Sequence, residues 1–143
     1  MGLWLMLLGA SPLQDAEYVR ELMQKKKATV GDVAMVFYSF LDGVPSTKEP
    51  KEAAAALVKA GRMPDGWDLS SNASLGEACV LICATLKIKG GLMMRLLGNP
   101  SRYCYRECVS KGLVRAAGPH SSVSGRDLMS IANRMEEALG ADK

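Results

Sequence analysis

The sequence contains few aromatic residues and no long apolar run. Phe, Trp and Tyr make up 6% of the 143 residues, although strands are usually enriched in aromatic and β-branched side chains. Ala, Leu and nine Met residues are prominent instead, and these residues favour helices. The apolar runs are shorter than the roughly 20 residues that a transmembrane helix needs. We therefore expect an all-α protein without a transmembrane segment.

Residues that build common catalytic and metal-binding motifs are also scarce. The single histidine, His120, lies in a serine-rich loop. The chain contains no His-Glu-x-x-His pair, no phosphate-binding loop and no glycine-rich dinucleotide turn. The sequence therefore predicts that the protein is not an enzyme and binds no metal or cofactor.

Positive charge is unevenly distributed along the chain. The net charge of +3 is too small to indicate nucleic-acid or membrane binding by itself. Residues 87–115, however, contain seven Lys and Arg residues against one Glu, a local charge of +6. Guanidinium groups and flat rings in this stretch suit an acidic glycan, a phosphate or RNA, and the alternative is an ordinary solvated helix face. The predicted ligand-binding residues are Arg95, Arg102, Tyr103, Tyr105, Arg106 and Lys111.

Three short motifs predict helix starts. In each, a hydroxyl residue precedes a carboxylate by three positions, and an apolar run follows. In such a capping box the hydroxyl accepts a hydrogen bond from the N–H three residues on, and the carboxylate accepts one from the N–H of the cap. This role explains the carboxylates better than acid–base catalysis does. The predicted capping pairs are Thr29 with Asp32, Ser74 with Glu77, and Ser124 with Asp127.

The spacing of these motifs, 45 and 50 residues, indicates an internal repeat. Each motif is followed by an apolar helical pattern that ends at a glycine, and each is preceded by another helical stretch. We predict three helix–loop–helix repeats, at about residues 12–43, 47–90 and 99–140, packed around one core in a single domain of residues 12–143. Residues 1–11 are either the remnant of a signal peptide, which predicts export, or an ordinary first helix, which predicts a cytoplasmic protein.

The four cysteines form two Cys-x-x-x-Cys pairs, Cys79 with Cys83 and Cys104 with Cys108. A spacing of four places both sulfurs of a pair on one helix face. Two such helices packed antiparallel could be joined by two disulfides or could surround a metal, although structural zinc sites usually have closer spacing. Buried free thiols are the alternative, because Cys79 and Cys83 lie among small apolar residues, where cysteine behaves as a hydrophobe.

The repeat pattern resembles the S-layer homology domain, a helix–loop–helix unit that usually occurs three times in bacterial cell-envelope proteins. The resemblance extends over residues 15–139 and rests on Trp67, Asn72, the box at 74–77 and the Lys-Gly-hydrophobic end of the helix at 103–113. It implies binding to an anionic secondary cell-wall polysaccharide. In that family an arginine in the box supplies much of the positive charge of the binding site. That position holds Val30, Leu75 and Gly125 here, and only Arg126, one place later, is basic. The resemblance therefore supports the architecture more strongly than the ligand.

These observations predict a non-enzymatic binding or interaction module of the periplasm or cell envelope. The expected partner is an acidic cell-wall polymer or another envelope protein. One alternative, less favoured, is a helical module that binds nucleic acid through residues 87–115, for which the low net charge gives no support by itself. The other is a helical protein stabilised by disulfides or a metal at its two cysteine pairs.

Overall fold

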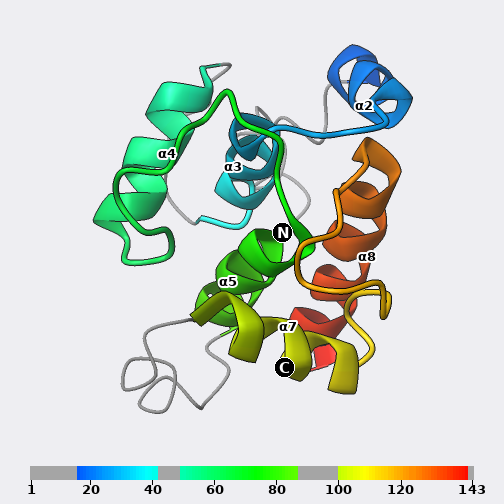
Figure 1. Ribbon diagram of the computed structural model, residues 1–143. Coiled ribbons are helices and arrows are strands. Elements are labelled where there is room, and N and C mark those ends of the chain that lie inside the picture. The colour runs from blue at the N-terminus through cyan, green and yellow to red at the C-terminus, as the bar shows by residue number, and fades with distance from the viewer. Residues whose placement is uncertain (1–15, 42–48, 87–99, 142–143) are drawn as a thin grey trace.

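The computed structural model describes residues 16–41, 49–86 and 100–141, and the regular elements in these ranges are all α-helices (Figure 1). The all-α prediction is confirmed. The predicted signal-peptide remnant or first helix at residues 1–11 lies outside the described residues, and so does Arg95. The helices are α2 (Ala16–Gln24), α3 (Val30–Tyr38), α4 (Pro50–Lys59), α5 (Leu75–Leu86), α7 (Pro100–Ser110) and α8 (Gly125–Ala141).

The three helices that begin at the capping boxes form the centre of the fold. α3, α5 and α8 all contact one another. Every residue of α3, from Val30 to Tyr38, is buried, which is typical of a helix with neighbours on all sides. The largest fully buried side chains of α5 and α8 are Leu75, Leu81, Ile82, Leu128 and Met135.

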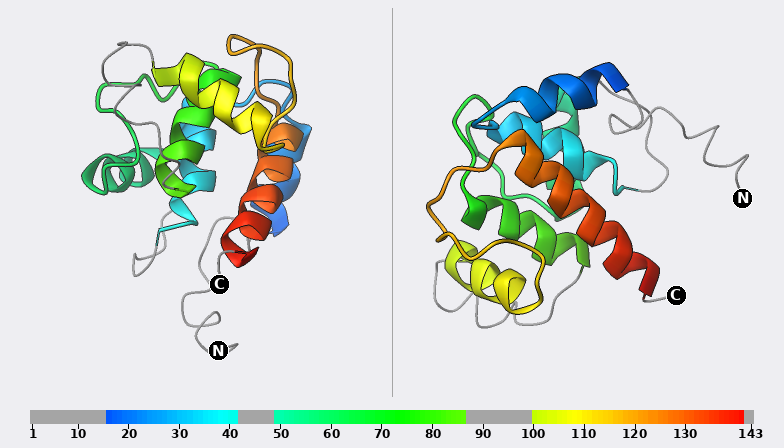
Figure 2. Two further views of the ribbon diagram at one scale, coloured as in Figure 1. Left: turned by 90° about the horizontal axis from the view of Figure 1, so that it is seen from below. Right: turned by 90° about the vertical axis from the view of Figure 1, so that its right-hand side faces the viewer.

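Each of the remaining helices packs against one central helix. α4 lies against α3, α7 against α5, and α2 against α8 (Figures 1 and 2). The predicted repeats pair α2 with α3, α4 with α5, and α7 with α8, so each outer helix contacts mainly the central helix of a different predicted unit. The long connections at residues 60–74 and 111–124 let the chain cross from the outside to the centre. The packing thus joins the units into one core, and their interpretation as repeats stays a prediction.

Both hydrogen bonds of a capping box are present at each central helix start. At α3, the N–H of Asp32 donates to Thr29 Oγ1 at 3.2 Å, and the N–H of Thr29 donates to Asp32 Oδ2 at 3.0 Å. The motif could be read from the sequence because its partners are only three residues apart. The other two boxes have the same pair of bonds at 3.0–3.1 Å, in Ser74 with Glu77 and in Ser124 with Asp127.

The residues immediately before the three caps form a closed ring of backbone hydrogen bonds. The N–H of Ala73 donates to the carbonyl of Ala28 at 2.9 Å, that of Val123 to Ala73 at 3.2 Å, and that of Ala28 to Val123 at 2.6 Å. All three residues are buried. The ring satisfies backbone groups that lie away from water and outside any helix. It therefore holds the three central helix starts at one point.

Candidate ligand-binding pocket

Loops cover the starts of two of the three central helices. The first two N–H groups of α3 donate to the carbonyl oxygens of Ser71 and Leu69, and those of α5 donate to Ser121 and Pro119. Each covering loop is part of a long connection that follows an outer helix, residues 60–74 after α4 and 111–124 after α7. The N-terminal N–H groups of α3 and α5 are therefore occupied by the protein itself.

The start of α8 is covered differently, because the connection after α2 is short. α2 ends at Gln24, and four residues separate it from the cap Thr29. The end of α2 meets α8 directly, and the N–H of Gly125 donates to the carbonyl of Lys25 at 3.0 Å. A Cβ at position 125 would overlap the carbonyl group of Leu22. A larger residue at this position would therefore push the end of α2 away from the start of α8.

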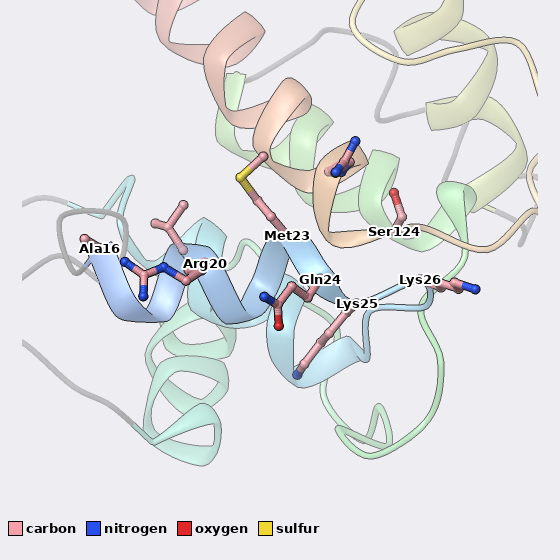
Figure 3. Close-up of a pocket in the computed structure, with 9 residues that line it drawn as sticks. Ala16, Arg20, Met23, Gln24, Lys25, Lys26 and Ser124 are labelled. Atoms are coloured by element: carbon pink, nitrogen blue, oxygen red, sulfur yellow. The ribbon is translucent and has the colours of Figure 1, made fainter.

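A pocket of about 830 Å³ lies where α2 meets the start of α8 (Figure 3). Figure 3 shows Met23 extending from α2 toward α8. Four of the lining side chains are cationic, and they come from three segments: Arg20 from α2, Lys25 and Lys26 from the connection, and Arg126 from the first turn of α8. The rest of the lining consists of Ala16, Val19, Met23, Gln24 and Ser124.

The four cations differ in their partners. Lys25 Nζ lies 3.0 Å from both carboxylate oxygens of Asp32, the capping residue of α3. Among the described residues, no carboxylate forms an ion pair with Arg20, Lys26 or Arg126, and all three are exposed. The N-terminus of α8 adds the positive end of a helix dipole. The pocket therefore presents positive charge that the described part of the chain leaves uncompensated.

One side of the pocket is apolar. Met23 is 41% exposed and is the one large hydrophobic side chain exposed within the described ranges. Val19, which also lines the pocket, is half-buried. A concave site that combines apolar contacts with a few polar groups is typical of small-ligand recognition. This arrangement can accept a ligand that carries anionic groups on a ring with an apolar face.

The charged residues predicted for ligand binding lie elsewhere. Arg102 and Arg106 are exposed on α7, and Lys111 is exposed just after it. None of them lines the pocket between α2 and α8. Arg115, from the same basic stretch, is bound through its Nε and Nη2 to the carboxylate of Asp127 at 3.3 and 3.2 Å. Part of the positive charge of residues 87–115 is thus neutralised by a capping residue.

The two tyrosines of the predicted site have different surroundings. Both Tyr103 and Tyr105 are half-buried on α7. The hydroxyl of Tyr105 accepts a hydrogen bond from the N–H of Gly118 at 2.7 Å. Tyr105 therefore anchors the loop that follows α7.

The capping-box carboxylate of Asp127 has structural partners that favour its ionised form. Burial opposes ionisation of Asp127, but the N–H of Ser124 and the guanidinium of Arg115 outweigh it, and the pKa of this carboxyl is lowered. His120 is exposed in the loop before Ser124.

The four cysteines lie together at the contact between α5 and α7. All four are buried free thiols. Cys83 Sγ lies 3.9 Å from the carbonyl oxygen of Cys104, and Cys108 Sγ lies 4.0 Å from that of Cys79. Within the described ranges, no set of three or more His, Cys, Asp or Glu residues is arranged to hold a metal ion.

The cationic pocket was not predicted from the sequence, although two of its residues, the cap Ser124 and Arg126, are named there in other roles. Arg126 was recognised as the basic residue nearest to the box position, but Arg20 and Lys26 were not associated with it. The available signal was the lysine run at 25–27, which stands where the other two predicted units have a glycine stop.

No helix of the described residues is both long enough and apolar enough to span a membrane. Comparisons with protein-family models, with curated proteins and with solved structures found no match.

Proposed function

We propose that this protein is a non-enzymatic binding module of the bacterial cell envelope, and that the pocket between α2 and α8 binds an acidic cell-wall polysaccharide. The observation that carries the proposal is the cluster of Arg20, Lys26 and Arg126, three exposed cations without a carboxylate partner in the described part of the chain. All three line one open pocket.

The types of cation favour carboxylate groups. An arginine guanidinium has donors in a fixed fork that matches both oxygens of a carboxylate, and such charge-assisted bonds are stronger than neutral ones. Arg20 and Arg126 approach the pocket from two different helices. An anionic sugar seated between them could be bound from two sides.

The apolar wall and the volume favour a sugar over a small inorganic anion. A pocket of about 830 Å³ falls within the roughly 300–1,000 Å³ that is usual for small-ligand sites. Met23 and Val19 offer apolar surface to the C–H face of a ring. We infer that one charged sugar of the polymer occupies the pocket.

The envelope setting rests on the S-layer homology resemblance. The three capping boxes of this chain are formed in the structure, and the family that the sequence resembles binds an anionic wall polysaccharide. The basic residues of the α2–α8 pocket supply charge that the boxes at Val30 and Leu75 do not. Among the described residues, the pocket is thus the best-supported place for an acidic ligand.

The test is binding of the full-length protein to purified acidic cell-wall polysaccharide, measured by titration calorimetry, with the same polymer after reduction of its carboxyl groups as a comparison. The double variant Arg20→Ala, Arg126→Ala should weaken binding at least about tenfold, which corresponds to the loss of one charge-assisted hydrogen bond. Carboxyl reduction should weaken binding by the wild type to a similar extent.

The matched control is Arg102→Ala, Arg106→Ala, which removes the same charge from the exposed face of α7. It should leave polysaccharide binding unchanged. The proposal is overturned if the wild type does not bind, if carboxyl reduction has no effect, or if the control variant loses as much affinity as the pocket variant. If the protein binds RNA more tightly than the polysaccharide, and if RNA binding depends on Arg102 and Arg106, the nucleic-acid alternative is favoured.

A further inference from the structure

The contact between α5 and α7 places cysteines opposite one another. Cys79 of α5 lies beside Cys108 of α7, and one turn further along α5, Cys83 lies beside Cys104. The residue number rises on one helix as it falls on the other, so the two helices run antiparallel at this contact. These contacts with the backbone pair Cys83 with Cys104 and Cys108 with Cys79, and the Cys83 thiol also lies beside that of Cys108.

The facing partners are better placed for bonding than partners on the same helix. Cys83 Sγ and Cys108 Sγ each lie within 4.0 Å of the backbone of the facing cysteine. Disulfides require Cα atoms about 4.4–6.8 Å apart and Cβ atoms that point toward each other. Two cysteines four residues apart on a helix have nearly parallel Cα–Cβ bonds, whereas facing cysteines point into the shared interface.

We propose that Cys79 bonds to Cys108 and Cys83 to Cys104, as two disulfides that cross-link α5 to α7 when the chain folds in an oxidising compartment. This cross-link is independent of the ligand of the α2–α8 pocket.

The reaction is thiol–disulfide exchange with a small disulfide such as oxidised glutathione. For each cross-link, one cysteine thiolate attacks the small disulfide, forms a mixed disulfide and releases one thiolate of the reagent. The thiolate of the facing cysteine then attacks the mixed disulfide and displaces the second thiolate of the reagent. One S–S bond forms in the protein, one S–S bond breaks in the reagent, and the two protons lost by the protein thiols pass to the released thiolates or to water.

The folded, reduced protein is expected to react slowly. The Cys104 thiol favours the thiolate form of Cys83, but the Cys108 thiol and burial outweigh it and raise the pKa of Cys83 to about 12. The neighbouring thiols and burial also raise the pKa of Cys104 and of Cys108. Because the thiolate is the nucleophile, the bonds should form mainly during folding, before α7 seals the cysteines against α5.

The first experiment uses the unmodified full-length protein. It is denatured and reduced, refolded with a mixture of oxidised and reduced glutathione, and digested without reduction for peptide mapping by mass spectrometry. We expect the loss of four hydrogen atoms, one for each cysteine, and the linkages 79–108 and 83–104. The oxidised protein should melt roughly 5–15 °C above its reduced form. Four free thiols after oxidative refolding, or linkages within one helix, would overturn the proposal.

Variants test the pairing without relying on the mapping. Cys79→Ala, Cys108→Ala retains the facing pair Cys83 and Cys104, and it should still form one disulfide. The matched control Cys83→Ala, Cys108→Ala also retains two cysteines, but these are Cys79 and Cys104, which do not face each other. It should form an intramolecular disulfide at least tenfold more slowly in the same refolding buffer. Equal rates in the two variants would contradict the assigned pairs.

Discussion

Gly125 packs against the carbonyl group of Leu22, so closely that a Cβ at position 125 would overlap it. This contact joins the end of α2 to the first residue of α8, about a hundred residues later in the chain. The N–H of Gly125 donates to Lys25 at the same junction. The pocket between α2 and α8 exists because the two helices meet here directly, without an intervening loop.

Replacing Gly125 with alanine should therefore destabilise the protein. The overlapping group is backbone rather than a flexible side chain, so α2 must move away from α8, and overpacking of this kind costs roughly 1–3 kcal/mol or more. We expect the free energy of unfolding, measured by urea denaturation, to fall by at least about 2 kcal/mol. The control is Gly140→Ala, because a Cβ there meets nothing within 4 Å, and this variant should be as stable as the wild type or slightly more stable.

The capping bond of Asp32 should contribute more to stability than its ion pair. Asp32→Ala leaves the N–H of Thr29 without its acceptor and removes the partner of Lys25, and we expect a loss of about 1–2 kcal/mol. Lys25→Ala removes only the ion pair, whose lysine side chain is 46% exposed, and should cost at most about 0.5 kcal/mol. Urea denaturation measures the free energy of unfolding of both variants. An equal decrease in the two would show that the ion pair contributes more than the capping bond.

Asp127 should make the protein sensitive to acid. Its pKa is lowered in the folded state, despite burial, by the N–H of Ser124 and by Arg115. The ionised carboxyl therefore stabilises the fold at pH values above its unfolded pKa of about 4, and this stabilisation is lost as the pH falls through the folded value. Asp127→Asn should be less stable than the wild type at neutral pH, and the difference should shrink below pH 4. Thermal melting of both proteins between neutral pH and pH values below 4 measures this stability difference. A difference that stays constant with pH would contradict the prediction.

Local features of this fold were predictable, because they depend on residues close together in sequence. The capping boxes need partners three residues apart, and the helices that follow them need only the apolar periodicity after Thr29, Ser74 and Ser124. The common face of Cys79 and Cys83 likewise follows from their spacing. These are the parts on which sequence and structure agree.

The pocket was not predictable, because its position is set by packing between distant segments. Arg20 and Arg126 become neighbours only when α2 lies against α8, and nothing in either segment specifies that pairing. The charges of the basic stretch at residues 87–115 are adjacent in sequence, yet in the fold Arg115 is bound to Asp127 and Tyr105 to the backbone of Gly118. Local charge density therefore indicated a different surface from the one at which the fold gathers cations.

The two tyrosines of α7 separate an anchoring role from a ligand-binding role. Tyr105→Phe removes the acceptor of the Gly118 N–H, and we expect it to lower the free energy of unfolding by about 0.5–1.5 kcal/mol. Hydrogen exchange at Gly118 should become faster, because the amide loses its protection. Tyr103→Phe is the matched control, since both tyrosines are half-buried on one helix, and it should leave stability and exchange unchanged. Binding of the acidic polysaccharide should be the same in both variants. A selective loss of affinity in either variant would show that α7 takes part in ligand binding.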